Sequence, residues 1–219
     1  MAAAELEPYS FPLYFLDFET IQYAIPRWAG TKPYQQIPFQ FSLHRLDSSS
    51  SWKHTEFLDL SGNDPTRDFA EKLVEDCGSE GAIFVYNASF EAARIKELSE
   101  RFEDLSSALL SLNERMVDLH PISKRNFYHP SQHGSWSIKY VLPAICPDMV
   151  EAYQNLVGVQ NGTMAMDAYI AATELGDMDP AKSEIADQLR SYCKLDTWAM
   201  VRIWSALTAV ELTSLTGDD

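Results

Sequence analysis

Apolar residues in the first half of the chain fall in short runs, which is typical of buried strands. The run LYFLDF at 13–18 is almost wholly apolar and predicts a strand that is buried on both faces. The runs at 38–46 and 52–58 flank a serine-rich tip and predict a hairpin. The run AIFVY at 82–86 predicts a fourth strand. An antiparallel meander followed by one more strand is therefore expected.

Helical periodicity dominates the remainder of the chain. Helices are predicted over 66–76, about 90–102, about 106–116 and 181–212, whereas 124–134 is loop-like. The last helix has one stripe that repeats at three- and four-residue steps, consisting of Ile185, Leu189, Tyr192, Asp196, Met200, Ile203 and Leu207. No internal repeat or linker divides the chain. A single domain over residues 1–219 is therefore predicted.

Composition narrows the class of protein. With 46% apolar and 22% charged residues in 219, the chain can build one sizeable core and is not disordered. Its net charge of −15 is unlike that of proteins that hold nucleic acid through overall positive charge. The three cysteines are widely spaced, which argues against a disulfide framework or a zinc knuckle. With no basic leader and no membrane-length apolar run, a cytoplasmic protein without a membrane partner is expected.

Two acidic residues mark the end of the first predicted strand. Three pairs have the D/E-x-D/E spacing, but only Asp17 and Glu19 follow a buried strand. Because strand side chains alternate, both carboxylates point to the same face, where they repel each other unless a cation lies between them. A strand end that emerges into solvent would give the same pair.

A carboxylate also interrupts the apolar stripe of the long helix. Asp196 would be costly there without a partner, because burial disfavours an unpaired charge. Tyr192 lies one turn earlier on the same face. The alternative is a buried Asp–Tyr or Asp–Arg hydrogen bond that only stabilises the core.

A further inward-facing carboxylate is predicted at Glu91, in the first turn of the helix after the fourth strand. The helix dipole alone would also favour a glutamate there. If all four carboxylates converge, they need hard divalent cations such as Mg²⁺ or Mn²⁺. His120, His129 and His133 have no spacing that would place them as a metal site. Cys193 is expected to be a small buried apolar residue.

Three motifs resemble those of the DnaQ-like 3′–5′ exonucleases, in the DEDDy branch of the RNase H-like superfamily. LDFET at 16–20 is similar to the first motif, VYNASFE at 85–91 to the second, and YCKLD at 192–196 to the third. The histidine branch does not fit, because position 191 is Ser. The stretches AGTKPYQQIPFQF and YHP…GSWSIKYVLP are similar to an uncharacterised bacterial family of such nucleases. In that family this domain is often the C-terminal part of a longer protein, so an excised domain is expected.

The resemblance implies an α/β RNase H-like fold with a central mixed five-stranded sheet flanked by helices. It implies hydrolysis of phosphodiester bonds by a two-metal mechanism with Mg²⁺ or Mn²⁺. The implied ligands are Asp17, Glu19, Glu91 and Asp196, with Asp17 bridging the two ions. Tyr192 would orient the attacking water, because a phenol with a pKa of about 10 is a poor base at neutral pH. Glu91 stands where most relatives of this branch carry Asp, and Asp118 is the substitute ligand if Glu91 points to solvent.

Nucleic acid, in the form of single-stranded 3′ ends, is the expected partner. Residues 20–46 and 119–147 contain no Asp or Glu, but they hold basic and aromatic residues: Arg27, Lys32, Arg45, Lys124, Arg125, Lys139, Trp28, Tyr34, Phe39, Phe127, Tyr128 and Trp136. This mixture suits phosphates and stacked bases. Core segments and tight turns would also lack acids. We expect Thr20, Asn87 and Lys139 to contact the substrate.

Two other functions fit the same residues. The chain could be a catalytically silent nucleic-acid-binding module of the same fold, or an endonuclease of the same superfamily. The residues do not distinguish DNA from RNA, and they do not indicate an oligomeric state.

Overall fold

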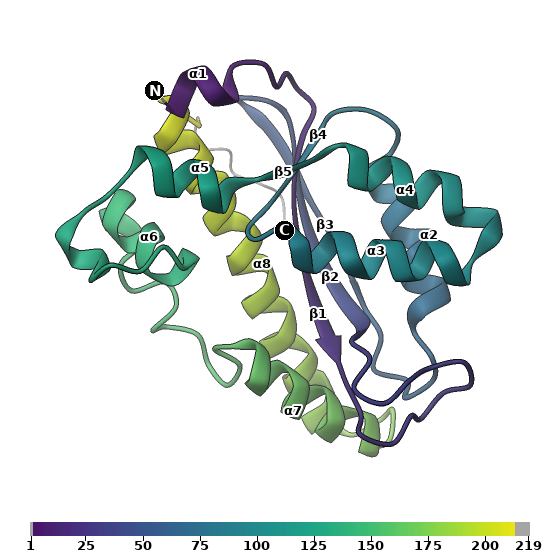
Figure 1. Ribbon diagram of the computed structural model, residues 1–219. Helices are drawn as coiled ribbons and strands as arrows, with labels where there is room; N and C mark the ends of the chain where they lie inside the picture. Colours follow the sequence, from purple (N-terminus) through teal and green to yellow (C-terminus); the bar gives the residue numbers. More distant parts are fainter. Residues whose placement is uncertain (1, 213–219) are drawn as a thin grey trace.

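The protein has an α/β fold, and the computed structural model describes residues 2–212 of it (Figure 1). Within them one five-stranded mixed sheet has the order β3-β2-β1-β4-β5. The strands are β1 (Leu13–Ile21), β2 (Ile37–Ser48), β3 (Ser51–Leu58), β4 (Ala82–Val85) and β5 (Met116–Asp118). The helices are α1 (Ala2–Leu6), α2 (Thr66–Cys77), α3 (Ser89–Arg101), α4 (Ser106–Glu114), α5 (Leu119–Asn126), α6 (Ile138–Ile145), α7 (Gly162–Glu174) and α8 (Pro180–Thr208).

Strand β1 is the centre of the sheet. It pairs antiparallel with β2 and parallel with β4, and β2 pairs antiparallel with β3. The β2–β3 hairpin closes where Ser48 pairs with Ser51, as the serine run predicts. Both faces of β1 are buried, as its apolar sequence predicts. The four predicted strands and the meander are therefore confirmed.

Helices cover both faces of the sheet (Figure 1). On one face, Leu16 and Phe18 of β1 pack with residues of α2, α3 and α4. On the other face, Leu13 and Phe15 pack with α8 and with the short helices α1 and α5. Helix α7 extends this second layer over the end of β1 that carries Ile21. The side chains of Asp17 and Glu19 alternate with those of Leu16 and Phe18 and therefore belong to the α8 side.

Several boundaries differ from the prediction. Helix α8 ends at Thr208 instead of 212, because Ala209 adopts a left-handed conformation with φ of 58° and terminates the helix. The predicted loop at 124–134 begins inside α5 and contains a short 3-10 helix at Pro130–Gln132. The hydrophobic pattern predicts none of the helices α1, α5, α6 and α7, and it does not locate the fifth strand, β5. No helix within residues 2–212 combines the length and the hydropathy that a bilayer span requires.

Candidate active site

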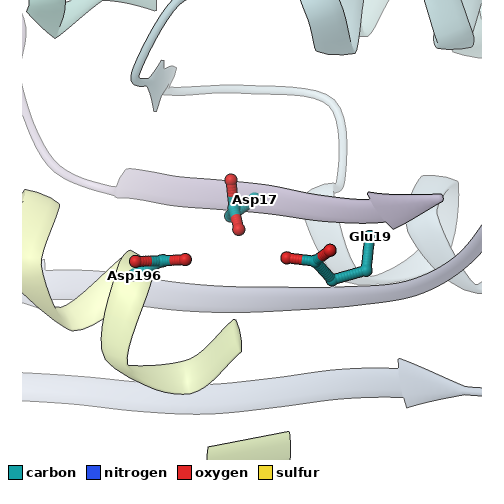
Figure 2. A group of neighbouring side chains, drawn as sticks. All are labelled: Asp17, Glu19 and Asp196. Atoms are coloured by element: carbon teal, nitrogen blue, oxygen red, sulfur yellow. The ribbon is translucent and has the colours of Figure 1, made fainter. Parts of the chain in front are cut away.

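Three carboxylates meet where β1 faces the middle of α8. Asp17 and Glu19 project from β1, and Asp196 projects from α8 toward them (Figure 2). One oxygen of each carboxylate lies within 4.8 Å of the others. Asp17 is half-buried, and Glu19 and Asp196 are buried. The alternation of β1 and the stripe of α8 thus bring together the residues that the sequence singles out.

Burial makes this cluster unfavourable for negative charge. Removal from water is the largest cause that raises the pKa of Asp17 well above its ordinary value, and the charges of Asp196, Glu19 and Glu91 raise it further. Burial raises the pKa of Glu19 to about 8; the charges of Asp196 and Glu91 add to this shift, and that of Lys139 opposes it. Burial also raises the pKa of Asp196, although a hydrogen bond from Tyr153 opposes the shift. At neutral pH the cluster therefore needs protons or a cation.

Glu91 lies in the first turn of α3 with its side chain buried, so it points inward as predicted. Its side chain is 3% exposed, and Oε2 has no hydrogen-bond partner. It lies outside the group of three, but its charge contributes to the raised pKa of Asp17 and Glu19. Burial raises its own pKa to about 8. This unpartnered oxygen and the three converging carboxylates are all hard oxygen donors, which suit a hard cation.

Asp118 is not available as the substitute ligand. Its carboxylate accepts hydrogen bonds from the backbone N–H groups of Asn87 and Ala88, each at 3.0 Å, and of His120 at 2.9 Å. It therefore holds the turn after β4 and caps α5. Asp118 is expected to replace Glu91 as a ligand only if Glu91 points to solvent, and Glu91 points inward instead.

Tyr192 lies one helical turn before Asp196 and is 5% exposed. Burial and the neighbouring charges of Asp196 and Glu19 raise the pKa of its hydroxyl, so the phenol stays protonated. The ammonium of Lys139 lies 5.1 Å from the centre of its ring. Lys139 also donates a 2.6 Å hydrogen bond to the carbonyl of Gln160. The predicted lysine thus lies beside the carboxylates with one donor already engaged.

Two cavities adjoin the carboxylates. Asp17 and Asp196 line a cavity of about 450 Å³ together with Asn87. Glu19 and Thr20 line a second cavity of about 540 Å³. Its other walls are Phe18, Gln36, Phe90, Asn161, Gly162, Thr163 and Met166. Thr20 and Asn87, both predicted to contact the substrate, therefore line different cavities, each of which includes a carboxylate of the cluster.

The comparisons with known proteins give a family without an assigned activity. A family model described as a domain of unknown function (DUF2779) matches residues 14–137, more than half of the chain. The chain belongs to this family. The matched DUF2779 region contains Asp17, Glu19 and Glu91, whereas Tyr192 and Asp196 follow it.

Two longer proteins are similar to this DUF2779 chain. It is 26% identical over 209 residues to "Uncharacterized protein UU173" of Ureaplasma parvum, and 28% identical over 207 residues to "Uncharacterized protein MG366 homolog" of Mycoplasma pneumoniae. Each alignment covers 86% of this chain but only 30% and 31% of the relatives, so the chain spans about a third of their length. No solved structure matches it significantly.

Two contacts at the site have no signal in the sequence pattern. The Tyr153 hydroxyl donates a 2.6 Å hydrogen bond to Oδ1 of Asp196 from an irregular connection that has no periodicity to interpret. The Asp–Tyr bond considered as an alternative therefore exists, but with a tyrosine from another segment. Cys193 is fully buried, as predicted, and its thiol also lies 3.9 Å from Oδ2 of Asp17.

A buried polar network fixes α8 against the sheet next to Asp196. Oγ1 of Thr197 lies 2.7 Å from Oγ of Ser42 and 2.8 Å from Nδ1 of His44. The Ser42 hydroxyl also lies 2.9 Å from Nε2 of His54. These buried polar groups are hydrogen-bond partners of one another, so they favour one rotation of α8 about its axis.

The two segments without Asp or Glu, residues 20–46 and 119–147, contain both core and surface residues. Phe39 is fully buried, so it cannot stack on a ligand. Tyr34 and Tyr128 are exposed and could do so. Arg45 and Arg125 form ion pairs with Asp47 and Glu5. Burial in the core therefore explains the lack of acidic residues for part of these two segments only.

We expect the metal-free protein to lose stability as the pH rises from about 6.5 to 8. Glu19 and Glu91, with pKa values of about 8 in place of 4.5, hold protons that the unfolded chain has released. Stability therefore falls as pH rises through this window. His44 and His54, with pKa lowered by burial to about 2 and about 4, act in the opposite sense only below about pH 6.5.

Urea unfolding in EDTA at several pH values measures this dependence. Glu19→Gln should reduce the slope, whereas Glu100→Gln, an exposed glutamate on α3, should leave it unchanged. A free energy of unfolding that stays constant or rises over the window would contradict the charge states assigned to the cluster.

Proposed function

We propose that this DUF2779 chain is a metal-dependent 3′–5′ exonuclease with an RNase H-like fold. The observation that carries the proposal is the convergence of three carboxylates within 4.8 Å, with Tyr192 one helical turn away. They come from the first and third motifs that resemble DEDDy nucleases. The mixed five-stranded sheet flanked by helices agrees with that fold.

The donor set fits Mg²⁺ or Mn²⁺. The group consists of carboxylate oxygens only, which are the ligands that these ions prefer. Asp17, Glu19 and Asp196 would hold the ions, and Glu91 would complete the set with its unpartnered oxygen. Bound cations would supply activation of water and compensation of charge at the leaving oxygen.

Residues of the chain would supply position and protons. The protonated hydroxyl of Tyr192 would orient the attacking water beside Asp196. The cavity lined by Glu19 and Thr20 has both apolar and polar walls, which suit the base and sugar of a terminal nucleotide. The cavity lined by Asn87 would receive the adjoining part of the strand. The ammonium of Lys139 would offset negative charge at the site.

Digestion of matched DNA and RNA oligomers tests the proposal. With 5′-labelled linear single strands and Mn²⁺, we expect a ladder that shortens from the 3′ end and releases mononucleotides. Circular single strands should stay intact, and the relative rates will give the preferred sugar. Cutting of circles would instead identify an endonuclease.

A silent binding module is the second candidate, because Glu91 lies outside the group of three carboxylates. This module would bind single strands in the presence of Mn²⁺ and yield no product from either linear or circular substrate. The same samples distinguish the two, provided that their circular dichroism spectra and melting curves are those of a folded protein.

Glu91→Gln is expected to lower the rate of hydrolysis by about tenfold or more at limiting Mn²⁺. The change removes a negative charge and a cation ligand while it keeps the length of the side chain. Glu100→Gln on the same helix is the matched control, because its side chain is exposed. Equal Mn²⁺ dependence of the two variants would exclude Glu91 from the site.

A further inference from the structure

The connection between α6 and α7, residues 146–161, lies along α8. At one end, Asp148 forms an ion pair of 2.8 Å with Arg202. At the other end, Gly158 approaches Gln188 so closely that a Cβ atom would overlap its side chain. These two anchor points on α8 are about 21 Å apart along the helix axis. The connection is therefore attached to α8 on both sides of Asp196.

Tyr153 lies between these anchors and contacts the carboxylate cluster. Its hydroxyl donates the 2.6 Å hydrogen bond to Oδ1 of Asp196. The ammonium of Lys139 lies 5.4 Å from the centre of the Tyr153 ring and 5.1 Å from that of Tyr192. The bond from Lys139 to the carbonyl of Gln160 joins this lysine to the same connection. Lys139 and the α6–α7 connection together hold the Tyr153 phenol in place.

We propose that Tyr153 is a positioning residue of the metal centre, which fixes Asp196 by binding one carboxylate oxygen and leaving the other to face Asp17 and Glu19. Figure 2 shows one oxygen of Asp196 directed toward the other two carboxylates and one directed away. This inference rests on the proposed function, since it assumes that the cluster holds a divalent cation. It assigns the α6–α7 connection a part in metal binding.

The physical reason lies in the freedom of an aspartate on a helix. Without a partner, the carboxylate of Asp196 can rotate, and a cation must then bear the entropy cost of fixing it. A hydrogen bond to an ionised acceptor is stronger than a neutral one, so the phenol orients the carboxylate most firmly when it is charged. Partners of this kind change metal affinity by about 10- to 100-fold in other proteins. Tyr192, from the same helix as Asp196, cannot anchor it to a separate segment.

Tyr153→Phe tests the proposal, because it removes the hydroxyl and keeps the ring near Lys139. The apparent Kd for Mn²⁺, measured by calorimetry and by electron paramagnetic resonance, should rise by about tenfold. Hydrolysis should return to near the parent rate at saturating Mn²⁺, so that the effect appears in the metal dependence and not in kcat. Tyr9→Phe, at an exposed tyrosine that follows α1, is the control and should match the parent.

The alternatives give different results. An unchanged Kd in Tyr153→Phe would mean that Tyr153 only packs against the site, and it would overturn the inference. A lower Kd would mean that the phenol competes with the cation, which also overturns it. If the parent protein itself binds no Mn²⁺, the proposed function fails together with the inference. If the parent protein binds Mn²⁺ and Tyr153→Phe binds it equally well, only the role of Tyr153 is refuted, and the proposed function stands.

Discussion

Asp17→Asn is expected to abolish metal-dependent hydrolysis and to leave the metal-free protein equally or more stable. Burial raises the pKa of Asp17 most, and the charges of Asp196, Glu19 and Glu91 raise it further. Asparagine needs neither a proton nor a cation at this site, and the substitution takes away a carboxylate that would hold the ions. Such an increase in stability with loss of function is typical of a residue that is kept for its chemistry.

Thermal unfolding with EDTA and with Mg²⁺, together with the digestion assay, measures both effects. The parent should be stabilised by Mg²⁺, and Asp17→Asn should respond much less. Asp177→Asn is a matched control, because it belongs to an acidic pair of the same spacing and lies exposed in an ion pair with Lys182. A sharp fall in the melting temperature of metal-free Asp17→Asn would assign Asp17 a structural role instead.

Tyr192→Phe is expected to lower the rate of hydrolysis on the order of 10²-fold with little change in stability. The ring keeps its packing against the residues of α7 and β2, so the loss of one hydroxyl should cost about 1 kcal/mol of unfolding free energy. The rate should fall much further, because a misplaced nucleophile loses the benefit of orientation. Mn²⁺ affinity should stay close to that of the parent.

The comparison with Tyr153→Phe makes this prediction specific. Both variants lose a hydroxyl near Asp196, but only Tyr153→Phe should be rescued by higher Mn²⁺. Single-turnover rates at several Mn²⁺ concentrations separate the two roles. Full activity in Tyr192→Phe, or rescue of its activity by Mn²⁺, would show that the Tyr192 hydroxyl does not orient the attacking water.

The core of the candidate site could be predicted because local periodicity places its residues. Alternation along β1 sets Asp17 and Glu19 on one face, and the stripe of α8 sets Asp196 and Tyr192 on one side of the helix. That these two elements pack against each other follows from the apolar residues around the carboxylates. These assignments need only the sequence within each element.

Other parts of the site depend on contacts between distant segments. Tyr153 lies in an irregular connection, and no pattern in residues 146–161 indicates that it reaches Asp196. Strand β5 has three residues, too few to show alternation. Helix α6 contains Pro143, which normally argues against a helix interior. The role of Asp118 in holding the turn after β4 likewise becomes visible only in the folded chain.

Crystals of the metal-free protein soaked in Mn²⁺ show whether the three carboxylates bind a metal ion. Anomalous scattering locates manganese without any assumption about activity. We expect an anomalous peak within direct coordination distance of Asp17, Glu19 and Asp196, and no such peak in Asp17→Asn crystals. Unperturbed carboxylates without a peak between them, or manganese bound only at other surfaces of the protein, would contradict the assignment of this cluster as a metal centre.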